Sequence, residues 1–451
     1  MSPPDIRNLS SATEDSRLAV LDGEVGPPDP TNFHMLLGRL EAAREKLPPL
    51  YREEVFTPFF TALNELGPTG FSQTLAQDPA RNGIAGLILD IAQAILQNGE
   101  GFQERATDAF QEVVSDLYDG YLSDADRRGI EPPDRGMVPP LVKWGNPSFG
   151  PYTWPVDVTQ DLGVGAPIVS LPPAHARLGL LAWAALGHET AGHDILHADT
   201  GLRRDLSRAV FDELLNENMG YALALYWSTR IDETASDVLG ILNMGPAAGI
   251  GLIGYFRGIR AAFTGAPKLS NIGGNGPHPA DILRGFLAAS TTELLSFSHA
   301  NAWAEILNAE TLRDVSTIRI EGSELSVNAA RRSAEIVAQT IVRTRVESLE
   351  SHALGDIQDW RDNDQQIAEH LQAELMDADR PLGCQGAETY AAHAVAAGVM
   401  AALTEGNHIP LILDRMISVL KAMHDANPSW GPLYIRHPGN IWRHRVYGGA
   451  A

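Results

Sequence analysis

The chain has 451 residues, which is too long for one ordinary hydrophobic core and predicts two or three lobes. Its 57 acidic and 34 basic residues give a net charge of −23, which repels phosphate backbones and anionic lipids. We therefore expect neither nucleic acid nor a membrane as a partner. Cys384 is the only cysteine, which excludes an intramolecular disulfide and a cysteine metal cluster and favours a cytoplasmic location.

The pattern along the chain predicts a mainly α-helical protein with a small β-sheet, in the α+β class. Residues 1–30 are rich in proline, serine and aspartate and lack apolar periodicity, so we expect a flexible N-terminal tail. Helical periodicity predicts a helical lobe over 31–138. The proline- and glycine-rich stretch that follows contains β-prone pieces at 141–144, 152–158 and 166–171, which predict a small sheet.

Helical periodicity then returns in two long candidates, 177–199 and 206–242. Together with the small sheet, these segments predict a central core over 139–300. Residues 301–451 are again mostly helical and predict a C-terminal helical lobe. A short alternating stretch at 316–327 has a glycine in its middle, which predicts a β-hairpin inside that lobe.

Residues 186–199, LGHETAGHDILHAD, contain three histidines and three acids. A zinc peptidase needs imidazoles and usually a carboxylate on the ion, with another carboxylate nearby that takes a proton from water. His188 and His193 are five residues apart, which on a regular α-helix places them about 140° apart around the axis. A local π-bulge or distorted turn would bring them to one face, and Gly192 is the residue type that tolerates such a distortion.

The same segment allows a second interpretation. His193 and His197 are four residues apart, and Asp194 follows the first, which gives HDILH with the shorter acid beside the metal. A site that uses all three histidines is a third interpretation. Sequence spacing leaves the choice of the second histidine open.

A further ligand should come from a later helix. The segment IDETASD contains Glu233 and Asp237, which are four residues apart and so share a helix face. One carboxylate could bind zinc while the other holds a ligand histidine in the correct tautomer.

These two motifs resemble those of a known family. HETAGH resembles the HExxGH signature of the dipeptidyl peptidase III family, a group of zinc exopeptidases whose motif also has the extra residue and the glycine. DETASD is similar to that family's second, acidic motif. The family belongs to the gluzincins, so the resemblance implies a zincin-like catalytic core between the helical lobes. It also implies that His188, His193 and Glu233 bind zinc, that Glu189 is the general base and that Asp237 supports a ligand.

Groups that support catalysis are predicted on both sides of these motifs. The loop and helix GGNGPHPADILRGFL resemble those of several gluzincin-like families, which implies that His278 steadies the oxyanion and that Arg284 supports the site. The strand GAPIVSLPP precedes the histidine segment, and we expect it to be the edge strand that pairs with substrate. Four tyrosines are further candidate oxyanion donors: Tyr152, Tyr221, Tyr226 and Tyr255.

The sequence thus predicts a zinc metallopeptidase that hydrolyses a peptide or protein substrate, with Glu189 as general base and His278 as a catalytic donor. One alternative is a metal-dependent phosphohydrolase of the HD type, built around His193 and Asp194. The other is a helical scaffold that keeps a metal site without catalysis.

Overall fold

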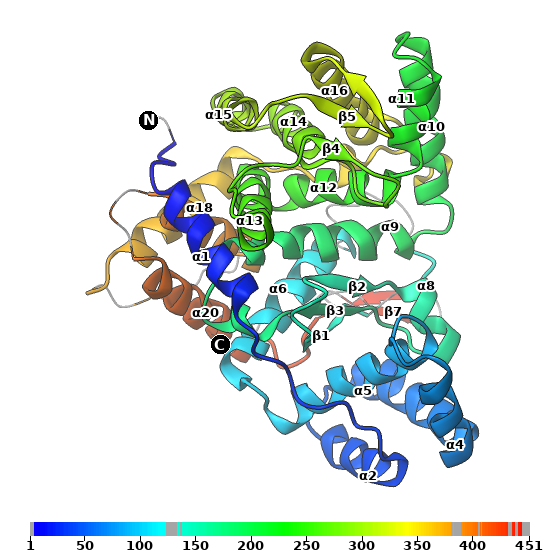
Figure 1. Cartoon of the computed structure of the whole chain (residues 1–451). Coiled ribbons are helices and arrows are strands. Elements are labelled where there is room, and N and C mark those ends of the chain that lie inside the picture. Colours follow the sequence, from blue (N-terminus) through cyan, green and yellow to red (C-terminus); the bar gives the residue numbers. More distant parts are fainter. Residues whose placement is uncertain are drawn as a thin grey trace.

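The computed structural model describes residues 4–122, 133–135, 138–379, 382, 389–404, 406, 408–431, 435–437 and 441–443. Helices dominate the described chain, and its strands form two three-stranded sheets and one two-stranded sheet (Figure 1). The prediction of a mainly α protein with a small β-sheet is therefore confirmed. Cys384 lies outside the described residues.

The elements up to the sheet are α1 (Leu9–Leu21), α2 (Phe33–Arg44), α3 (Pro49–Tyr51), η1 (Arg52–Phe56), α4 (Thr57–Gln77), α5 (Ile84–Glu100), α6 (Glu104–Leu122), β1 (Leu141–Trp144), β2 (Tyr152–Trp154), α8 (Val156–Thr159), η2 (Gln160–Leu162) and β3 (Ile168–Leu171). The central elements are η3 (Pro173–Ala176), η4 (Leu180–Ala184), η5 (Gly187–Asp194), α9 (Ile195–Ala198), α10 (Leu202–Asn216), α11 (Tyr221–Ser228), α12 (Ile231–Met244), α13 (Pro246–Thr264), β4 (Ile272–Gly273) and α14 (Asp281–Glu293). The remaining elements are α15 (Ala300–Arg313), β5 (Ile318–Ile320), β6 (Ser323–Leu325), α16 (Val327–Arg343), η6 (Glu347–Leu349), α17 (Leu354–Ile357), α18 (Asp362–Met376), α19 (Ala391–Leu403), α20 (Ile409–Asp425), β7 (Ile435–His437) and β8 (Ile441–Arg443).

The N-terminal segment contains a packed helix where we expected a flexible tail. Helix α1 lies along α13 (Figure 1), and its buried face is made of small residues such as Ala12, Ser16 and Ala19. Asp15 on the same helix accepts hydrogen bonds from the backbone N–H groups of Gly179 and Leu180, at 2.9 and 3.0 Å. These contacts fix the start of η4, the turn that leads into the histidine segment.

The sheet β1-β3-β2 lies between two helical layers. Its strands are the three β-prone pieces expected, with β3 parallel to β1 and antiparallel to β2. Along β1, Leu141 belongs to the hydrophobic cluster of α2, α4 and α5, while Val142 belongs to the cluster of α6 and the central helices. This alternation is the period of two that a strand imposes on its side chains. The sheet therefore has α5 on one face and η5 on the other.

Helix η5 packs closely against α12, which carries the acidic motif, and α14 packs against α12 from the other side. The predicted hairpin is present as antiparallel β5 and β6. No helix in the described part of the chain is both long and apolar enough to span a bilayer.

Candidate metal centre

The histidine segment forms a π-helix, η5, over Gly187–Asp194. In a π-helix the backbone hydrogen bonds join residues five apart, so His188 and His193 become neighbours on one face. Their ring centroids are 4.7 Å apart. The distortion expected from the five-residue spacing is therefore present, and it extends through the whole motif.

Gly192 is required by packing between η5 and α12. A Cβ added to Gly192 would lie 2.4 Å from the Cβ of Ser236 and 2.5 Å from its Cα. Gly187 and Gly240 meet in the same way, since a Cβ on Gly240 would lie 3.1 Å from the carbonyl carbon of Gly187. These glycines bring the histidine helix and the acidic helix close enough for their side chains to share one site.

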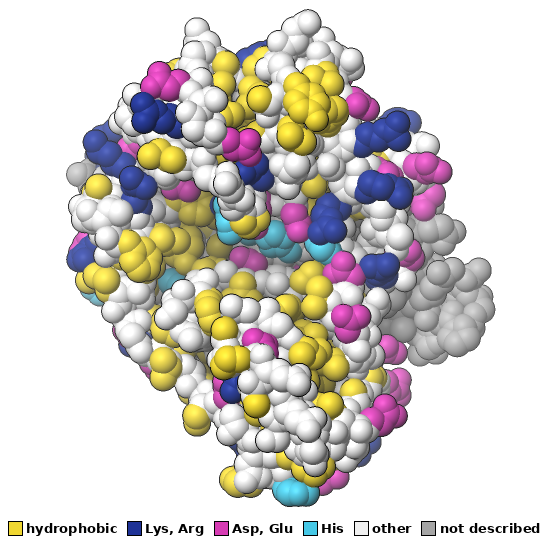
Figure 2. Space-filling model, turned by 45° about the vertical axis from the view of Figure 1, so that its right-hand side comes forward, with side chains coloured by type: hydrophobic (Ala, Val, Ile, Leu, Met, Phe, Trp, Pro, Cys, Tyr) yellow, Lys and Arg dark blue, Asp and Glu magenta, His cyan; other side chains and the backbone are white. Residues whose placement is uncertain are grey.

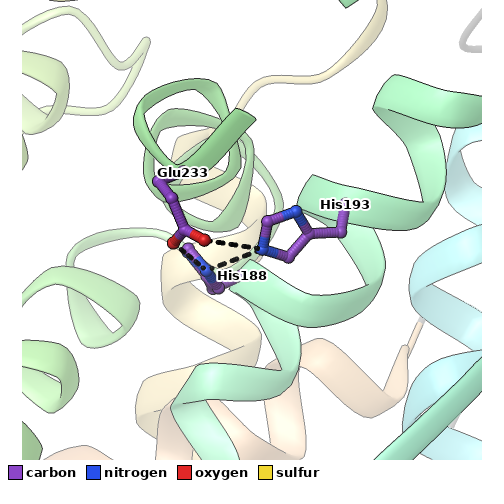
Figure 3. Close-up of side chains that lie close together, drawn as sticks. All are labelled: His188, His193 and Glu233. Atoms are coloured by element: carbon purple, nitrogen blue, oxygen red, sulfur yellow. Dashed lines mark hydrogen bonds and ion pairs between the residues drawn. The ribbon is translucent and has the colours of Figure 1, made fainter. Parts of the chain in front are cut away.

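His188, His193 and Glu233 form a triangle between these two helices (Figure 3). The two histidine Nε2 atoms are 3.1 Å apart, and Glu233 carboxylate oxygens lie 3.3 Å from Nε2 of His188 and 3.7 Å from Nε2 of His193. An ion bound tetrahedrally at about 2.0–2.1 Å holds its ligand atoms about 3.3 Å apart. Glu233 Oε2 is also buried, and the contact with Nε2 of His188 is the one polar contact that the structure gives it among the described residues. The donor set thus fits a zinc-sized cation.

Asp237 and Arg284 hold the ring of His188. His188 Nδ1–H donates to Asp237 Oδ1 at 2.8 Å, which leaves Nε2 free to bind a cation. Arg284 donates two hydrogen bonds to Asp237, both at 2.7 Å, and all three side chains are buried. Burial opposes ionisation of Asp237, but the charge and hydrogen bonds of Arg284 hold the pKa of this carboxyl well below its usual range.

The carboxylates around the triangle stabilise a positive charge on the imidazole of His188. Burial disfavours a charged His188, yet the carboxylates of Asp237 and Glu233 raise the pKa of this imidazole to about 10. For Glu233, burial is likewise outweighed by the hydrogen bond and charge of His188, which lower the pKa of its carboxyl to about 2. A divalent cation in the triangle would supply the positive charge beside Glu233, while Asp237 keeps its hydrogen bond with Nδ1 of His188.

Asp232 holds the second histidine of the triangle, and the sequence interpretation had missed it. Its Oδ1 accepts a hydrogen bond from His193 Nδ1 at 3.2 Å. Asp232 directly precedes Glu233 in the sequence. An acid next to a candidate ligand was therefore the sequence signal that could have identified it. Hydrogen bonds from His193 and His197 outweigh the burial of Asp232 and hold the pKa of its carboxyl far below the usual value.

His197 lies outside the triangle. Its Nδ1 is 2.9 Å from Asp157 Oδ2, and its Nε2 is 3.3 Å from both carboxylate oxygens of Asp232. Its two ring nitrogens are therefore occupied by carboxylates on opposite sides. Of the two pairs left open by the sequence, the structure brings together His188 and His193, while His197 supports Asp232.

Glu189 faces the sheet, where Thr153 Oγ1 donates to its Oε2 at 2.9 Å. Thr153 is the middle residue of β2, the strand at the edge of the sheet. Our expectation that the strand in GAPIVSLPP is this edge was wrong, because β3 (168–171) pairs with β1 on one side and β2 on the other. Among the described residues, the edge strand beside the histidine helix is β2.

Of the remaining candidate donors, His278 lies beside the metal-binding triangle and one tyrosine lines the adjoining cavity. Nε2 of His278 is 3.3 Å from Glu233 Oε1, and most of its side chain is exposed. Tyr255 is buried and lines the same cavity as Glu189. The other three candidate tyrosines are engaged elsewhere or exposed: Tyr152 donates to Asp90, Tyr226 accepts from the N–H of Ala280, and Tyr221 is 64% exposed on α11.

The centre opens into a cavity of about 550 Å³ whose wall includes His188, Glu189, His278 and Arg284. Figure 2 shows a hollow across this face of the molecule, with histidine side chains on its floor and hydrophobic side chains along its border. The volume lies within the range of small-molecule and substrate sites. The residues that meet at the centre are therefore accessible to a substrate.

Comparisons with models of known protein families, with curated protein sequences and with solved structures gave no match.

Proposed function

We propose that the protein is a zinc-dependent peptidase. The observation that supports this most is the triangle of His188, His193 and Glu233 with an acidic side chain, Glu189, beside it at an open cavity. A site that only stabilised the fold would have no use for a carboxylate at this cavity that is not itself one of the candidate ligands. Zinc bound there would supply a Lewis acid that makes water a nucleophile at neutral pH.

The surrounding residues have roles in this proposal. Glu189, oriented by Thr153, takes a proton from the attacking water and passes it to the leaving amine. His278 donates a hydrogen bond to the carbonyl oxygen of the cleaved bond, with Tyr255 as a second donor. The edge of β2 that has no strand partner among the described residues pairs with the extended substrate backbone next to Glu189. A cytoplasmic location, favoured by the single cysteine, belongs to the same proposal.

The HD-type phosphohydrolase has less support. That chemistry requires His193 and Asp194 to bind the same ion. Asp194 is fully buried, and its carboxylate is not part of the group of candidate ligands found among the described residues. Burial and the nearby charge of Glu189 raise the pKa of Asp194 well above its usual value, which favours a neutral side chain there.

Glu189→Gln tests the proposal directly, since it keeps the size of the side chain and removes the base. We expect the variant to retain one zinc per chain and to lose hydrolysis of an unfolded casein substrate by a factor of at least about 100. Zinc content by elemental analysis is the control for an intact site. A variant that cleaves casein at the wild-type rate would contradict the role of Glu189.

A further inference from the structure

The cleft differs in chemistry on the two sides of the metal centre. The cavity beside His188 and Glu189 has a mostly apolar wall from α13 and from the loop before β2. Beyond His193, the side chains that gather around His197 are charged and partly exposed. They are Asp157, Asp232 and Arg203, with side-chain exposures of 28%, 34% and 51%.

The apolar cavity is built from segments far apart in the chain. Its lining includes Leu252 and Ile259 of α13, Phe149 of the loop before β2 and Val20 of α1. Phe149 and Phe263 are 54% and 77% exposed at its border. Large aromatic side chains left in water beside a catalytic group indicate a surface that substrate covers.

We propose that this cavity binds a large apolar side chain, of the leucine or phenylalanine class, on one of the two residues that flank the cleaved bond. The assignment rests on the proposed peptidase function. The position of the cavity indicates what it binds. His278 and Glu189 both line it, so a peptide bond whose carbonyl oxygen accepts from His278 has a flanking side chain within reach of the apolar lining. In this proposal the residue on the other side of the cleaved bond lies toward the charged side chains around His197. The preference for an apolar side chain therefore applies to only one of the two flanking residues.

The N-terminal helix α1 thereby becomes part of the specificity site. Val20 contributes to the cavity, and α1 is held in place by its packing on α13 and by the hydrogen bonds from Gly179 and Leu180 to Asp15. Full burial of a leucine or phenylalanine side chain should raise kcat/KM roughly 10- to 100-fold over alanine.

The test uses two series of quenched fluorescent peptides. Each varies one residue from alanine to leucine to phenylalanine, either directly before or directly after the cleaved bond, which is identified by mass spectrometry. We expect kcat/KM to rise at least about 10-fold with side-chain size in one series and to stay within about threefold in the other.

Two variants locate the preference in this cavity. Val20→Trp should fill the space and lower kcat/KM for phenylalanine peptides more than for alanine peptides, which removes the preference. Ile259→Asp should weaken the preference for phenylalanine from a different helix, α13. The matched control is Leu21→Trp, because Leu21 is the next residue of α1, is 53% exposed and does not line the cavity. Zinc content shows that each variant keeps its site.

The experiment distinguishes failure of the cavity assignment from failure of the peptidase proposal. Wild-type protein that cleaves peptides of both series without an apolar preference overturns the cavity assignment and leaves the peptidase proposal standing. The same holds if both cavity variants keep the wild-type preference. Zinc-loaded protein that cleaves no peptide of either series overturns both proposals.

Discussion

Replacing Gly192 with alanine tests whether close helix contact builds the metal centre. The new Cβ would lie 2.4 and 2.5 Å from the Cβ and Cα of Ser236, and the Cα cannot move without moving α12. Overpacking of this kind costs about 1–3 kcal/mol, and the higher helix propensity of alanine offsets up to about 1 kcal/mol. We therefore expect the free energy of unfolding to fall by about 1–2 kcal/mol. Separation of His193 from Glu233 should also weaken zinc binding about tenfold or more.

The assays are urea unfolding of the metal-free protein and zinc titration against a competing chelator. Gly38→Ala is the matched control, because Gly38 lies in helix α2 and a Cβ there would meet no atom within 4 Å. The control should be neutral or gain up to about 1 kcal/mol, with unchanged zinc affinity. The reasoning fails if Gly192→Ala matches wild type in both assays.

Three further predictions concern single side chains. Asp232→Asn should weaken zinc binding about 10- to 100-fold in a chelator competition, because it removes the charge that holds His193, and an unchanged affinity would remove Asp232 from the site. Arg284→Ala should lower the free energy of unfolding in urea by about 3–5 kcal/mol, since it removes the guanidinium that neutralises the buried charge of Asp237 and leaves it only the hydrogen bond from His188, and a loss under about 1 kcal/mol would contradict this. Burial lowers the pKa of His175 to about 4, so the unfolded chain binds the extra proton first as the pH falls, and stability should drop by about 3 kcal/mol between pH 6.5 and 4. His175→Phe should lack this part of the acid sensitivity, and identical pH profiles of unfolding would refute the assignment.

The sequence predicted the elements whose signal is local. The three short strands, the hairpin and the distortion between His188 and His193 all follow from side-chain period or spacing, and all are present. The order of the strands does not follow from local signals, because pairing joins residues far apart. We therefore assigned the substrate edge to the strand nearest the histidines in sequence, whereas β2 lies at that edge.

Helix α1 had no apolar period because its packing uses small residues. Its buried positions include Ala12, Thr13 and Ser16, and they lie against glycines of α13. A Cβ added to Gly258 would be 2.7 Å from Ser16 Cβ. Two helix faces made of small residues can pack closely and bury α1 without large hydrophobic side chains. A prediction based on hydrophobic periodicity therefore gave a flexible tail.

Zinc titration of chelator-treated protein by calorimetry tests the central claim most directly. We predict one zinc site per chain in the wild type and in Glu189→Gln, and loss of that site in His188→Ala, His193→Ala and Glu233→Ala. His197→Ala should keep the site with weaker affinity, because His197 holds Asp232 and does not belong to the triangle. A wild-type chain that binds no zinc, or zinc binding that survives unchanged in His188→Ala, would contradict the account.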